Sequence, residues 1–393
     1  MTAPTAHSSR HPNANVVQAL LTGEQRGLVA KQSGGDGGSR PTTRLKPWDP
    51  DEVEVKPGPV SDEKAFSQSV ISPLRYPGAK RQLVPIIEQI IKGNVPPPRL
   101  FVEPFCGGAS TALRLVGAGV VEHAVLADVD DLVYAFWYTA VFDTSWLINR
   151  MMDVEVTVAK WEWFRLSDPK GRRDKALKCL FLNRTTFSGI LHGRAGPIGG
   201  KNQTSATKYK IDCRFNKEAL AARLRAIGEL GNTGRILDVW NSDWRETLSR
   251  LKREYSHRLT VDEILVYFDP PYVEKAEFLY PWAFGDDEHR ALASTLGVTT
   301  GYRWLLSYDD NPLARELYPP GTDGRHVLHA RHRYSAAGLR ATAEGKRKRP
   351  HREELLITNF VDLPVSDAYH MLGQQSCAAC QGYAPSGPPD EAG

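Results

Sequence analysis

The chain has 393 residues, of which 41% are hydrophobic and 24% charged, and its formal net charge at pH 7 is +4. This composition is that of an ordinary globular protein with a large core, and it excludes a disordered or fibrous chain. No apolar run is long enough to span a bilayer and no secretory signal is recognisable, so we expect a cytoplasmic protein without a membrane partner.

The basic charge is concentrated in two segments. Residues 165–225 hold fifteen Lys and Arg against four Asp and Glu, and residues 325–352 hold nine against one. The rest of the chain is therefore acidic. Two strongly basic segments beside an acidic remainder favour nucleic acid as a partner over a merely solvated surface.

The five cysteines are odd in number and mostly scattered, which argues against structural disulfides. Cys377 and Cys380 form a single Cys-x-x-Cys pair, and no second pair completes a zinc site. We therefore expect no metal, with a zinc or redox role for this pair as the weaker alternative.

In chain order, residues 1–68 are rich in Ser, Gly, Pro and charge with little periodicity, and we expect a disordered arm. Order is expected from about Ile71. The segment Pro73–Lys80 places an aromatic residue and a lysine on a Gly turn, ahead of a helical pattern that begins at Leu83. A turn that leads into a helix N-terminus suits a carboxylate ligand, and a loop with a chance lysine fits equally well.

Two apolar runs follow. Leu100–Ser110 predicts a strand, a Gly-rich turn and the start of a helix, which together form the first unit of a nucleotide-type site. The spacing is not Gly-x-Gly-x-x-Gly, so a dinucleotide is not expected. His123–Ala127 predicts a second strand that ends at Asp128, the position of an acid that binds a ribose diol. Asp130 and Asp131 follow closely and leave the choice of acid open, with Asp128 preferred.

The most basic part of the chain begins after the apolar run at residues 180–182 and continues to Lys210. It combines Arg, Lys, Asn, Thr and Tyr with Gly turns, and these residue types make both phosphate and base-edge contacts. The run Gly196–Lys201 is superficially like a phosphate loop. We reject that interpretation, because Ala195 and Asn202 stand where the motif needs Gly and Ser or Thr.

The later elements continue the alternation of helices and strands. They are expected as a helix over 217–230, a strand over 235–239, a helix over 287–295, and strands over 304–308 and 354–360. The basic segment 325–352 is expected to be a long loop between the last two strands. Strands that alternate with helices predict a mostly parallel sheet with helices on both faces.

The apolar run Val266–Phe268 stops at Asp269-Pro270-Pro271-Tyr272. A buried parallel strand places such an acid at its carboxyl end, where open α/β sheets bind ligands. The two prolines prevent helix and ladder from continuing, so the Pro270 carbonyl and Asp269 become acceptors for an amino group. Tyr272 offers a face to a flat ring. The alternative is a strand that simply ends in a Pro-rich turn.

Taken together, these motifs resemble the Dam-like family of DNA adenine N6-methyltransferases. The resemblance runs in order from about Ile71 to Phe360, through Tyr76–Lys80, Phe101–Gly107, Asp128, Asn183–Gly189, Asp269–Tyr272, Leu306–Asp309 and Glu354–Leu356. Departures from the family pattern are Tyr76 in place of Trp, and Ala79 and Ala109 in place of Gly.

The resemblance implies a Rossmann-like class I methyltransferase fold and S-adenosylmethionine as methyl donor. By position, the cofactor contacts would be Tyr76, Lys80, Glu103, Phe105, Asp128 and Asp269. The catalytic residues would be Asp269, Pro270, Pro271 and Tyr272. The DNA-binding residues would be Asn183, Arg184, Arg194 and Lys201.

We therefore expect a catalytic domain over residues 69–140 and 232–365, an inserted basic target-recognition subdomain over 141–231, and a disordered tail over 366–393. The expected reaction is methylation of adenine N6 in a specific double-stranded DNA sequence with base flipping. Cytosine N4 methylation, RNA amino methylation and an inactive DNA-binding protein remain alternatives. The resemblance implies a bacterial or phage-infected cell, where the protein would associate with the nucleoid. It leaves open the recognition sequence and a cognate endonuclease of a restriction–modification system.

Overall fold

A computed structural model describes residues 70–76, 80, 82–271, 284–298, 300–322, 324–333, 340–341, 347–348 and 351–372. The arm expected over 1–68, Tyr272 and the pair Cys377 and Cys380 lie outside these ranges. Among the helices of the described residues, none combines the length and apolar character that crossing a membrane requires.

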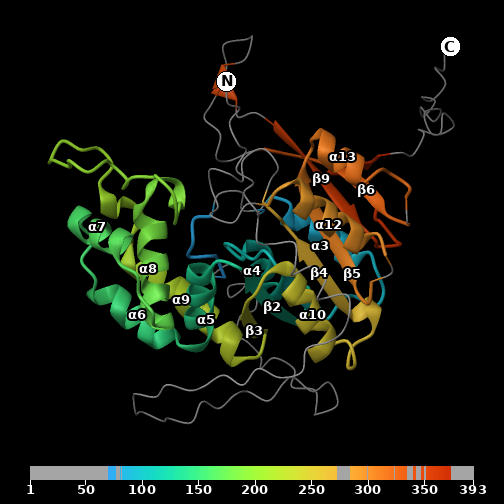
Figure 1. Ribbon diagram of the computed structural model, residues 1–393, viewed down its shortest axis with the longest axis horizontal. Helices are drawn as coiled ribbons and strands as arrows, with labels where there is room; N and C mark the ends of the chain where they lie inside the picture. The colour runs from blue at the N-terminus through green and yellow to red at the C-terminus, as the bar shows by residue number, and fades with distance from the viewer. Residues whose placement is uncertain are drawn as a thin grey trace, which may run out of the picture. The chain divides into compact units, whose positions relative to one another are not determined.

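Eight strands form one sheet in the order β10-β6-β9-β5-β4-β1-β2-β3 (Figure 1). The strands are β1 Leu100–Glu103, β2 His123–Asp128, β3 Ile236–Asn241, β4 Ile264–Phe268, β5 Arg303–Asp309, β6 His326–Arg333, β9 His351–Thr358 and β10 Tyr369–Met371. Strands β3, β2, β1, β4 and β5 are parallel, as predicted. At the other end of the sheet, β9 runs antiparallel to both β5 and β6, and β10 runs antiparallel to β6.

This order places a topological switch point between β1 and β4. From β1 the chain continues to β2 and then β3 on one side, whereas β4 and β5 are added on the other side. Open α/β sheets bind ligands outside the carboxyl ends of the strands at such a point. The fold therefore brings the ends of β1 and β4 together where a ligand is expected.

Helices cover both faces of the sheet. One hydrophobic core includes residues of α3 Val84–Lys92, α4 Ser110–Gly117, α5 Asp131–Phe142 and α9 Lys217–Asn232, and a second includes residues of α10 Trp244–Glu254, α12 Asp286–Leu296 and α13 Pro312–Leu317. Alternate residues of β1 enter opposite cores, since Phe101 belongs to the first core and Val102 to the second. The architecture is a three-layer α/β/α arrangement.

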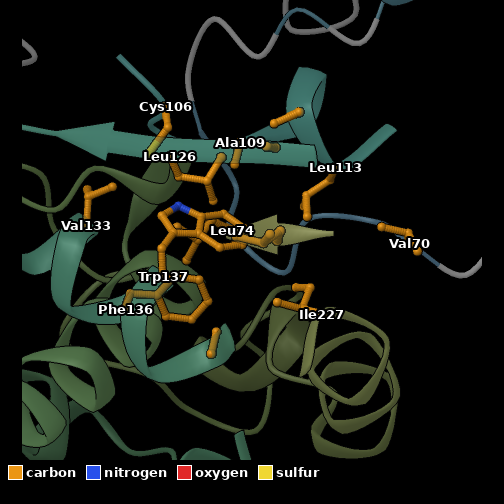
Figure 2. Close-up of a cluster of buried hydrophobic side chains, with 14 of the residues drawn as sticks. Val70, Leu74, Cys106, Ala109, Leu113, Leu126, Val133, Phe136, Trp137 and Ile227 are labelled. Atoms are coloured by element: carbon orange, nitrogen blue, oxygen red, sulfur yellow. The ribbon is translucent and has the colours of Figure 1, made fainter. Parts of the chain in front are cut away.

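The first core lies directly beneath the turn that follows β1. Figure 2 shows Trp137 of α5 among Leu113, Leu126 and Ala109, and the Trp137 side chain is fully buried. Its indole Nε1 donates a hydrogen bond of 2.8 Å to the Gly107 carbonyl. The buried indole therefore holds the backbone of the turn in place from below.

Three further helices lie between β2 and β3 in the sequence: α6 Thr144–Asp153, α7 Val158–Leu166 and α8 Arg172–Thr185. They pack on α5 and α9 and on one another. Aromatic side chains fill the contacts, with the Phe181 ring centroid 4.6 Å from that of Phe164 and 5.6 Å from that of Phe215. Helix α9 lies inside the expected insert 141–231, yet it packs against α4, α5 and β3.

The prediction of a long loop over 325–352 is wrong. Strands β6 and β9 form an antiparallel hairpin there, and β7 Arg340–Ala341 pairs with β8 Arg347–Lys348. The sequence of β6 is dominated by His and Arg and lacks an apolar run, but Leu328 and Ala330 are buried through its pairing with β9. Strand β10 likewise lies within the expected tail 366–393 and extends the sheet edge.

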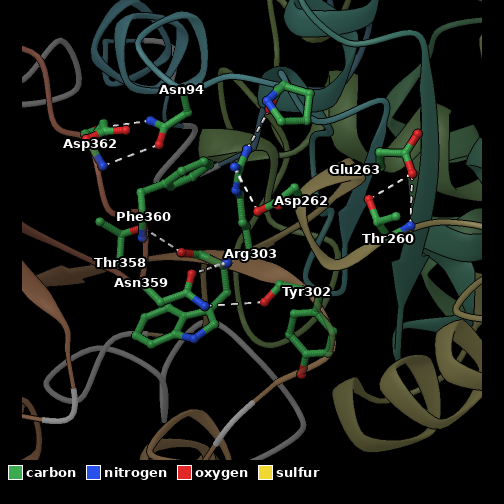
Figure 3. A network of polar contacts seen from close by, with 12 residues as sticks. Asn94, Thr260, Asp262, Glu263, Tyr302, Arg303, Thr358, Asn359, Phe360 and Asp362 are labelled. Carbon is green, nitrogen blue, oxygen red and sulfur yellow. Dashed lines mark hydrogen bonds and ion pairs between the residues drawn. The ribbon is translucent and has the colours of Figure 1, made fainter.

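Polar contacts close the amino end of β5, at the opposite end of that strand from the predicted site (Figure 3). Arg303 donates to the Pro96 carbonyl at 2.7 Å and forms an ion pair of 2.8 Å with Asp262. Asn94 donates a hydrogen bond of 2.7 Å to the Asp362 carbonyl. These contacts join α3, β5 and the segment after β9.

Candidate active site

The predicted site acids converge as expected. Glu103 is the last residue of β1, Asp128 the last of β2, and Asp269 directly follows β4. Because the sheet order is β2-β1-β4, the three carboxylates stand at adjacent strand ends beside the switch point. The strand patterns in the sequence placed Asp128 and Asp269 at this edge, and the family resemblance added Glu103.

Lys80 and Ser307 both contact one oxygen of Asp269. The Lys80 Nζ lies 2.5 Å from Asp269 Oδ1, and the side chains are 5% and 20% exposed. Ser307 Oγ donates to the same oxygen at 3.0 Å, and the Tyr267 hydroxyl lies 3.0 Å from Ser307 Oγ. No hydrogen bond joins Asp269 Oδ2 to any of the described residues. The carboxylate is therefore fixed in orientation, with its second oxygen left as an acceptor.

Glu103 is a buried acid beside this pair, with 3% of its surface exposed. Its Oε2 accepts a hydrogen bond of 3.4 Å from the Ala112 backbone amide in the first turn of α4. Burial raises the pKa of Glu103 well above its ordinary value, and the negative charge of Asp269 raises it further. The buried Glu103 carboxyl therefore favours its neutral form, while Lys80 forms the ion pair with Asp269 beside it.

The turn after β1 fits closely against Tyr76. Gly107 has φ +43°, and a Cβ atom there would lie 2.6 Å from the Tyr76 ring; one on Gly108 would lie 2.9 Å from Tyr76 Cβ. Glycine is therefore required at both positions. Ala109 also has positive φ, 46°, and is fully buried, so the departure from Gly noted in the sequence falls at a strained backbone position.

Asp128 stabilises the turn after β1 by hydrogen bonding. Its Oδ2 accepts a hydrogen bond of 2.8 Å from the Gly107 amide, and its Oδ1 accepts one of 2.9 Å from the Asp130 amide. Burial raises the pKa of Asp128 to about 7, and the charge of Asp130 contributes to that increase. Asp130 caps α5 through the Leu132 amide, and its other oxygen lies 2.7 Å from His192 Nε2. Asp128 and Asp130, two of the three acids considered in the sequence, therefore lie beside the turn.

Asn183 does not lie where it can contact DNA. It is fully buried, and its side-chain amide bonds to the Arg75 amide at 2.6 Å and to the Arg75 and Gly189 carbonyls at 3.0 Å each. This corrects the DNA-binding assignment, because no surface of Asn183 is open in this conformation. Neighbouring Arg184 is half-buried and donates to the Arg214 carbonyl at 2.7 Å and the Pro73 carbonyl at 3.3 Å.

The other two predicted DNA-binding residues are at the surface. Arg194 is exposed, and Lys201 is 63% exposed with an ion pair of 3.2 Å to Glu162. Phe187, which was not predicted as a DNA contact, is 66% exposed in a short helical turn, η1 Phe187–Gly189. Lys208, Tyr209 and Lys210, at the end of the predicted basic segment, are also exposed. Exposed basic and aromatic residues therefore gather on the segment 187–210.

The structure describes the predicted catalytic motif as far as Pro271. Pro270 is buried and Pro271 half-buried, and Tyr272 lies outside the described residues. Phe105, predicted as a cofactor contact, packs edge-on against Phe284 with ring centroids 5.7 Å apart. The two sides of the switch point are thus joined by aromatic rings.

Ser307 and Tyr267 are site residues that sequence reasoning missed. Both are fully buried, yet the Ser307 hydroxyl bonds to the Tyr267 hydroxyl and to Asp269. A signal was present, because Ser307 is a lone small polar residue in the apolar run of β5. Buried hydroxyls in a strand require a partner.

The fold and the site together define a class of protein. A central α/β sheet with a Gly turn after β1 and acids at the ends of β1, β2 and β4 fits a methyltransferase fold. Residues 76–238 match the model of a family described as D12 class N6 adenine-specific DNA methyltransferase. Through this segment the chain is similar to that family, and the match indicates that the protein is an adenine-specific DNA methyltransferase. A comparison with curated proteins gave no match.

The matched segment contains part of the site. It includes Tyr76, Lys80, Glu103 and Asp128, and it ends within β3, before the strand that precedes Asp269. The family resemblance stated from the sequence is confirmed. The role of Asp269 rests instead on its contacts with Lys80 and Ser307.

Proposed function

We propose that this enzyme transfers a methyl group from S-adenosylmethionine to N6 of an adenine that is flipped out of a specific double-stranded DNA sequence. The observation that carries the proposal is the fixed carboxylate of Asp269. Its Oδ1 is held by Lys80 and Ser307, and its Oδ2 is left to accept a hydrogen bond from an amino group. A preorganised acceptor beside a ligand-binding turn suits methyl transfer to an amine.

An exocyclic adenine amine is a weak nucleophile, because its lone pair is delocalised into the ring. Hydrogen bonds from the amine to Asp269 Oδ2 and to the Pro270 carbonyl favour a pyramidal nitrogen whose lone pair is available. The position of these acceptors at the end of β4 cannot be reached by a base inside a duplex, so the target base flips out of the helix. Tyr272, which follows Pro271, provides the aromatic face for stacking.

The residues at the switch point suit the proposed cofactor. When bound, S-adenosylmethionine supplies an electrophilic methyl group on a positively charged sulfur. Asp128 and Asp130 are acceptors for its ribose hydroxyls, and the carboxyl oxygens of Glu103 and Asp269 are polar groups at the neighbouring strand ends. Lack of side chains at Gly107 and Gly108 lets Tyr76 pack directly on this turn. Lys80, Tyr76 and Phe105 complete the proposed set.

The segment 187–210 is the proposed DNA surface. Lys208, Lys210 and Arg194 are exposed cations for phosphates, and Tyr209 is 57% exposed beside them. The exposed ring of Phe187 suits an apolar wedge that enters the base stack. The bacterial or phage-infected setting and a cognate endonuclease remain part of the proposal on the family resemblance alone.

The proposal is tested by methyl transfer from labelled S-adenosylmethionine to plasmid DNA, followed by sequencing of the product for modified bases. We expect N6-methyladenine at one recurring sequence, and no transfer by Asp269→Ala. The variant Asp153→Ala is a matched control, because Asp153 is an exposed acid at the end of α6. Modification of cytosine N4 or of RNA would overturn the assignment of the substrate.

A further inference from the structure

The DNA-facing segment and the cofactor turn are joined by two separate chains of contacts that both end at Gly107. We infer that His192 is a positioning residue: it ties the loop after η1 to the turn after β1 through Asp130, so that cofactor affinity and DNA binding depend on each other. The inference rests on the proposed function, since it assigns a role within the same site.

The first chain of contacts runs through three carboxylate hydrogen bonds. His192 Nε2 lies 2.7 Å from Asp130 Oδ2, and the side chains are 30% and 7% exposed. The Asp130 amide donates to Asp128 Oδ1 at 2.9 Å, and the Gly107 amide donates to Asp128 Oδ2 at 2.8 Å. A displacement of His192 therefore reaches the turn through two acids that have little contact with solvent.

The second chain of contacts runs through the buried amide of Asn183. This amide binds both the amide and the carbonyl of Arg75 and also the Gly189 carbonyl. A Cβ atom on Gly189 would lie 2.1 Å from the Arg75 carbonyl oxygen, so the two backbones are in direct contact. The next residue, Tyr76, lies against Gly107. These contacts hold the turn that bears Phe187 against Arg75, and the ring of the adjacent Tyr76 packs on the turn after β1.

The loop around His192 is itself anchored on both sides. Arg165 of α7 donates to the Leu191 carbonyl at 3.1 Å and also bonds to the Gly193 carbonyl. His192 is therefore held between two fixed carbonyl groups and is presented to Asp130. A contact of DNA with Phe187 or Arg194 acts on the same short segment of chain. Coupling of this kind is carried by contiguous packed and hydrogen-bonded groups.

The coupling between cofactor binding and DNA binding is reciprocal. If DNA binding raises cofactor affinity by some factor, cofactor binding raises DNA affinity by the same factor, because both belong to one thermodynamic cycle. Removal of the His192 imidazole leaves the buried Asp130 carboxylate without this partner, and Asp130 no longer has a fixed position relative to the loop. We expect cofactor affinity of the DNA-free enzyme to fall about tenfold, within the usual range of such couplings.

The test measures the dissociation constant of S-adenosylmethionine by calorimetry, with and without a duplex that contains the methylated sequence. His192→Ala should bind the cofactor more weakly and lose the effect of the duplex. His192→Gln should restore both, because the Gln amide nitrogen occupies about the place of imidazole Nε2. Arg194→Ala is the matched control on the same loop: it should weaken DNA binding and leave cofactor affinity without DNA unchanged.

The outcomes separate the two proposals. Failure of the wild-type enzyme to bind S-adenosylmethionine would overturn the proposed function and the inference with it. Wild-type cofactor affinity and coupling in a folded His192→Ala variant would overturn the inference alone, as would a His192→Gln variant no better than His192→Ala. If His192→Ala fails to fold, His192→Asn replaces it, since the shorter amide falls short of Asp130.

Discussion

Lys80 Nζ lies 2.5 Å from Asp269 Oδ1, although 189 residues separate the two in the chain. The lysine comes from the segment before α3, and the aspartate follows β4 on the other side of the switch point. The proposed catalytic carboxylate is therefore oriented by a residue that is distant from it in the sequence. This pairing also joins the segment that bears Tyr76 to the strand that precedes the proposed catalytic motif.

Replacement of Lys80 by Met should lower methyl transfer at least about a hundredfold, because Asp269 loses the cation that fixes the position of its Oδ1. The pair is largely buried, so loss of one partner should also lower the free energy of unfolding by about 3 kcal/mol. Initial rates and denaturant unfolding measure the two effects. Lys92→Met is the control, since Lys92 is 63% exposed in an i,i+4 pair with Glu88. Near-normal rates in Lys80→Met would remove Lys80 from the mechanism.

Replacement of Ser307 by Ala should reduce kcat about tenfold and leave KM for DNA almost unchanged. Asp269 keeps Lys80 but loses the second group that fixes its orientation, and small misplacements at a reacting centre are costly. Tyr267→Phe is the matched comparison, because it removes the neighbouring hydroxyl and keeps the bond from Ser307 to Asp269. We expect a smaller decrease in kcat for Tyr267→Phe. Equal effects on both kcat and KM in Ser307→Ala would show that the role is not confined to positioning.

The parallel part of the sheet and the acids at its edge were predictable, because each depends on short-range patterns. Apolar runs that end at Asp128 and Asp269 identify strands, and strand ends of parallel neighbours meet at one edge. The hairpin of β6 and β9 was not predictable in this way. Its buried residues, such as Leu328, are separated by His and Arg, and burial arises from pairing across the sheet.

The sequence predicted which residues belong to the site better than it predicted the contacts that these residues make. An Asn followed by Arg in a basic segment suggests a DNA contact. The Asn183 side chain instead forms hydrogen bonds with backbone groups of Arg75 and Gly189. Only the tertiary fold decides whether a polar side chain faces solvent or satisfies buried amides. The link from His192 to Asp130 spans 62 residues and leaves no periodic trace in the sequence.

The stability of the enzyme should decrease as pH rises from about 4 to about 7, in part through Asp128. Burial raises the pKa of Asp128 to about 7, whereas the unfolded chain titrates near 3.8. Between these values the native state holds a proton that the unfolded state has lost, so stability falls with rising pH and stays at the lower level above about 7. Glu103 acts in the same direction, since its pKa is also raised.

Asp128→Asn cannot ionise and should remove up to about 3 kcal/mol of the stability difference between about pH 5 and about pH 8. Denaturant unfolding at both pH values measures this difference. The slope with pH is the informative quantity, because loss of one acceptor at Gly107 shifts both values equally. Asp153→Asn, at an exposed position, is the control. An unchanged slope in Asp128→Asn would contradict the raised pKa.

Replacement of Lys208 and Lys210 together by Ala should weaken DNA binding at all sequences and reduce the salt dependence of binding by about two counterions. Both residues are exposed on the segment that also carries Tyr209. Titration of labelled duplexes at several salt concentrations gives the slope. The control is Lys252→Ala. Lys252 is exposed on α10, a helix on the face of the sheet opposite α5 and α9. The same slope in the double variant and the wild type would exclude these lysines from the DNA surface.

Gly189→Ala should lower the free energy of unfolding by more than about 2 kcal/mol, whereas Gly200→Ala should cost about 1 kcal/mol. Both glycines have φ near 80°, at +78° and +80°, so the backbone strain of an added side chain is nearly the same. They differ in surroundings: a Cβ on Gly189 would lie 2.1 Å from the Arg75 carbonyl oxygen, and one on Gly200 would meet nothing within 4 Å. The difference between the two variants in denaturant unfolding therefore isolates the contact of Gly189 with Arg75. If the two substitutions cost the same, the close fit between the loop that bears Phe187 and the segment that bears Tyr76 is not a feature of the folded enzyme.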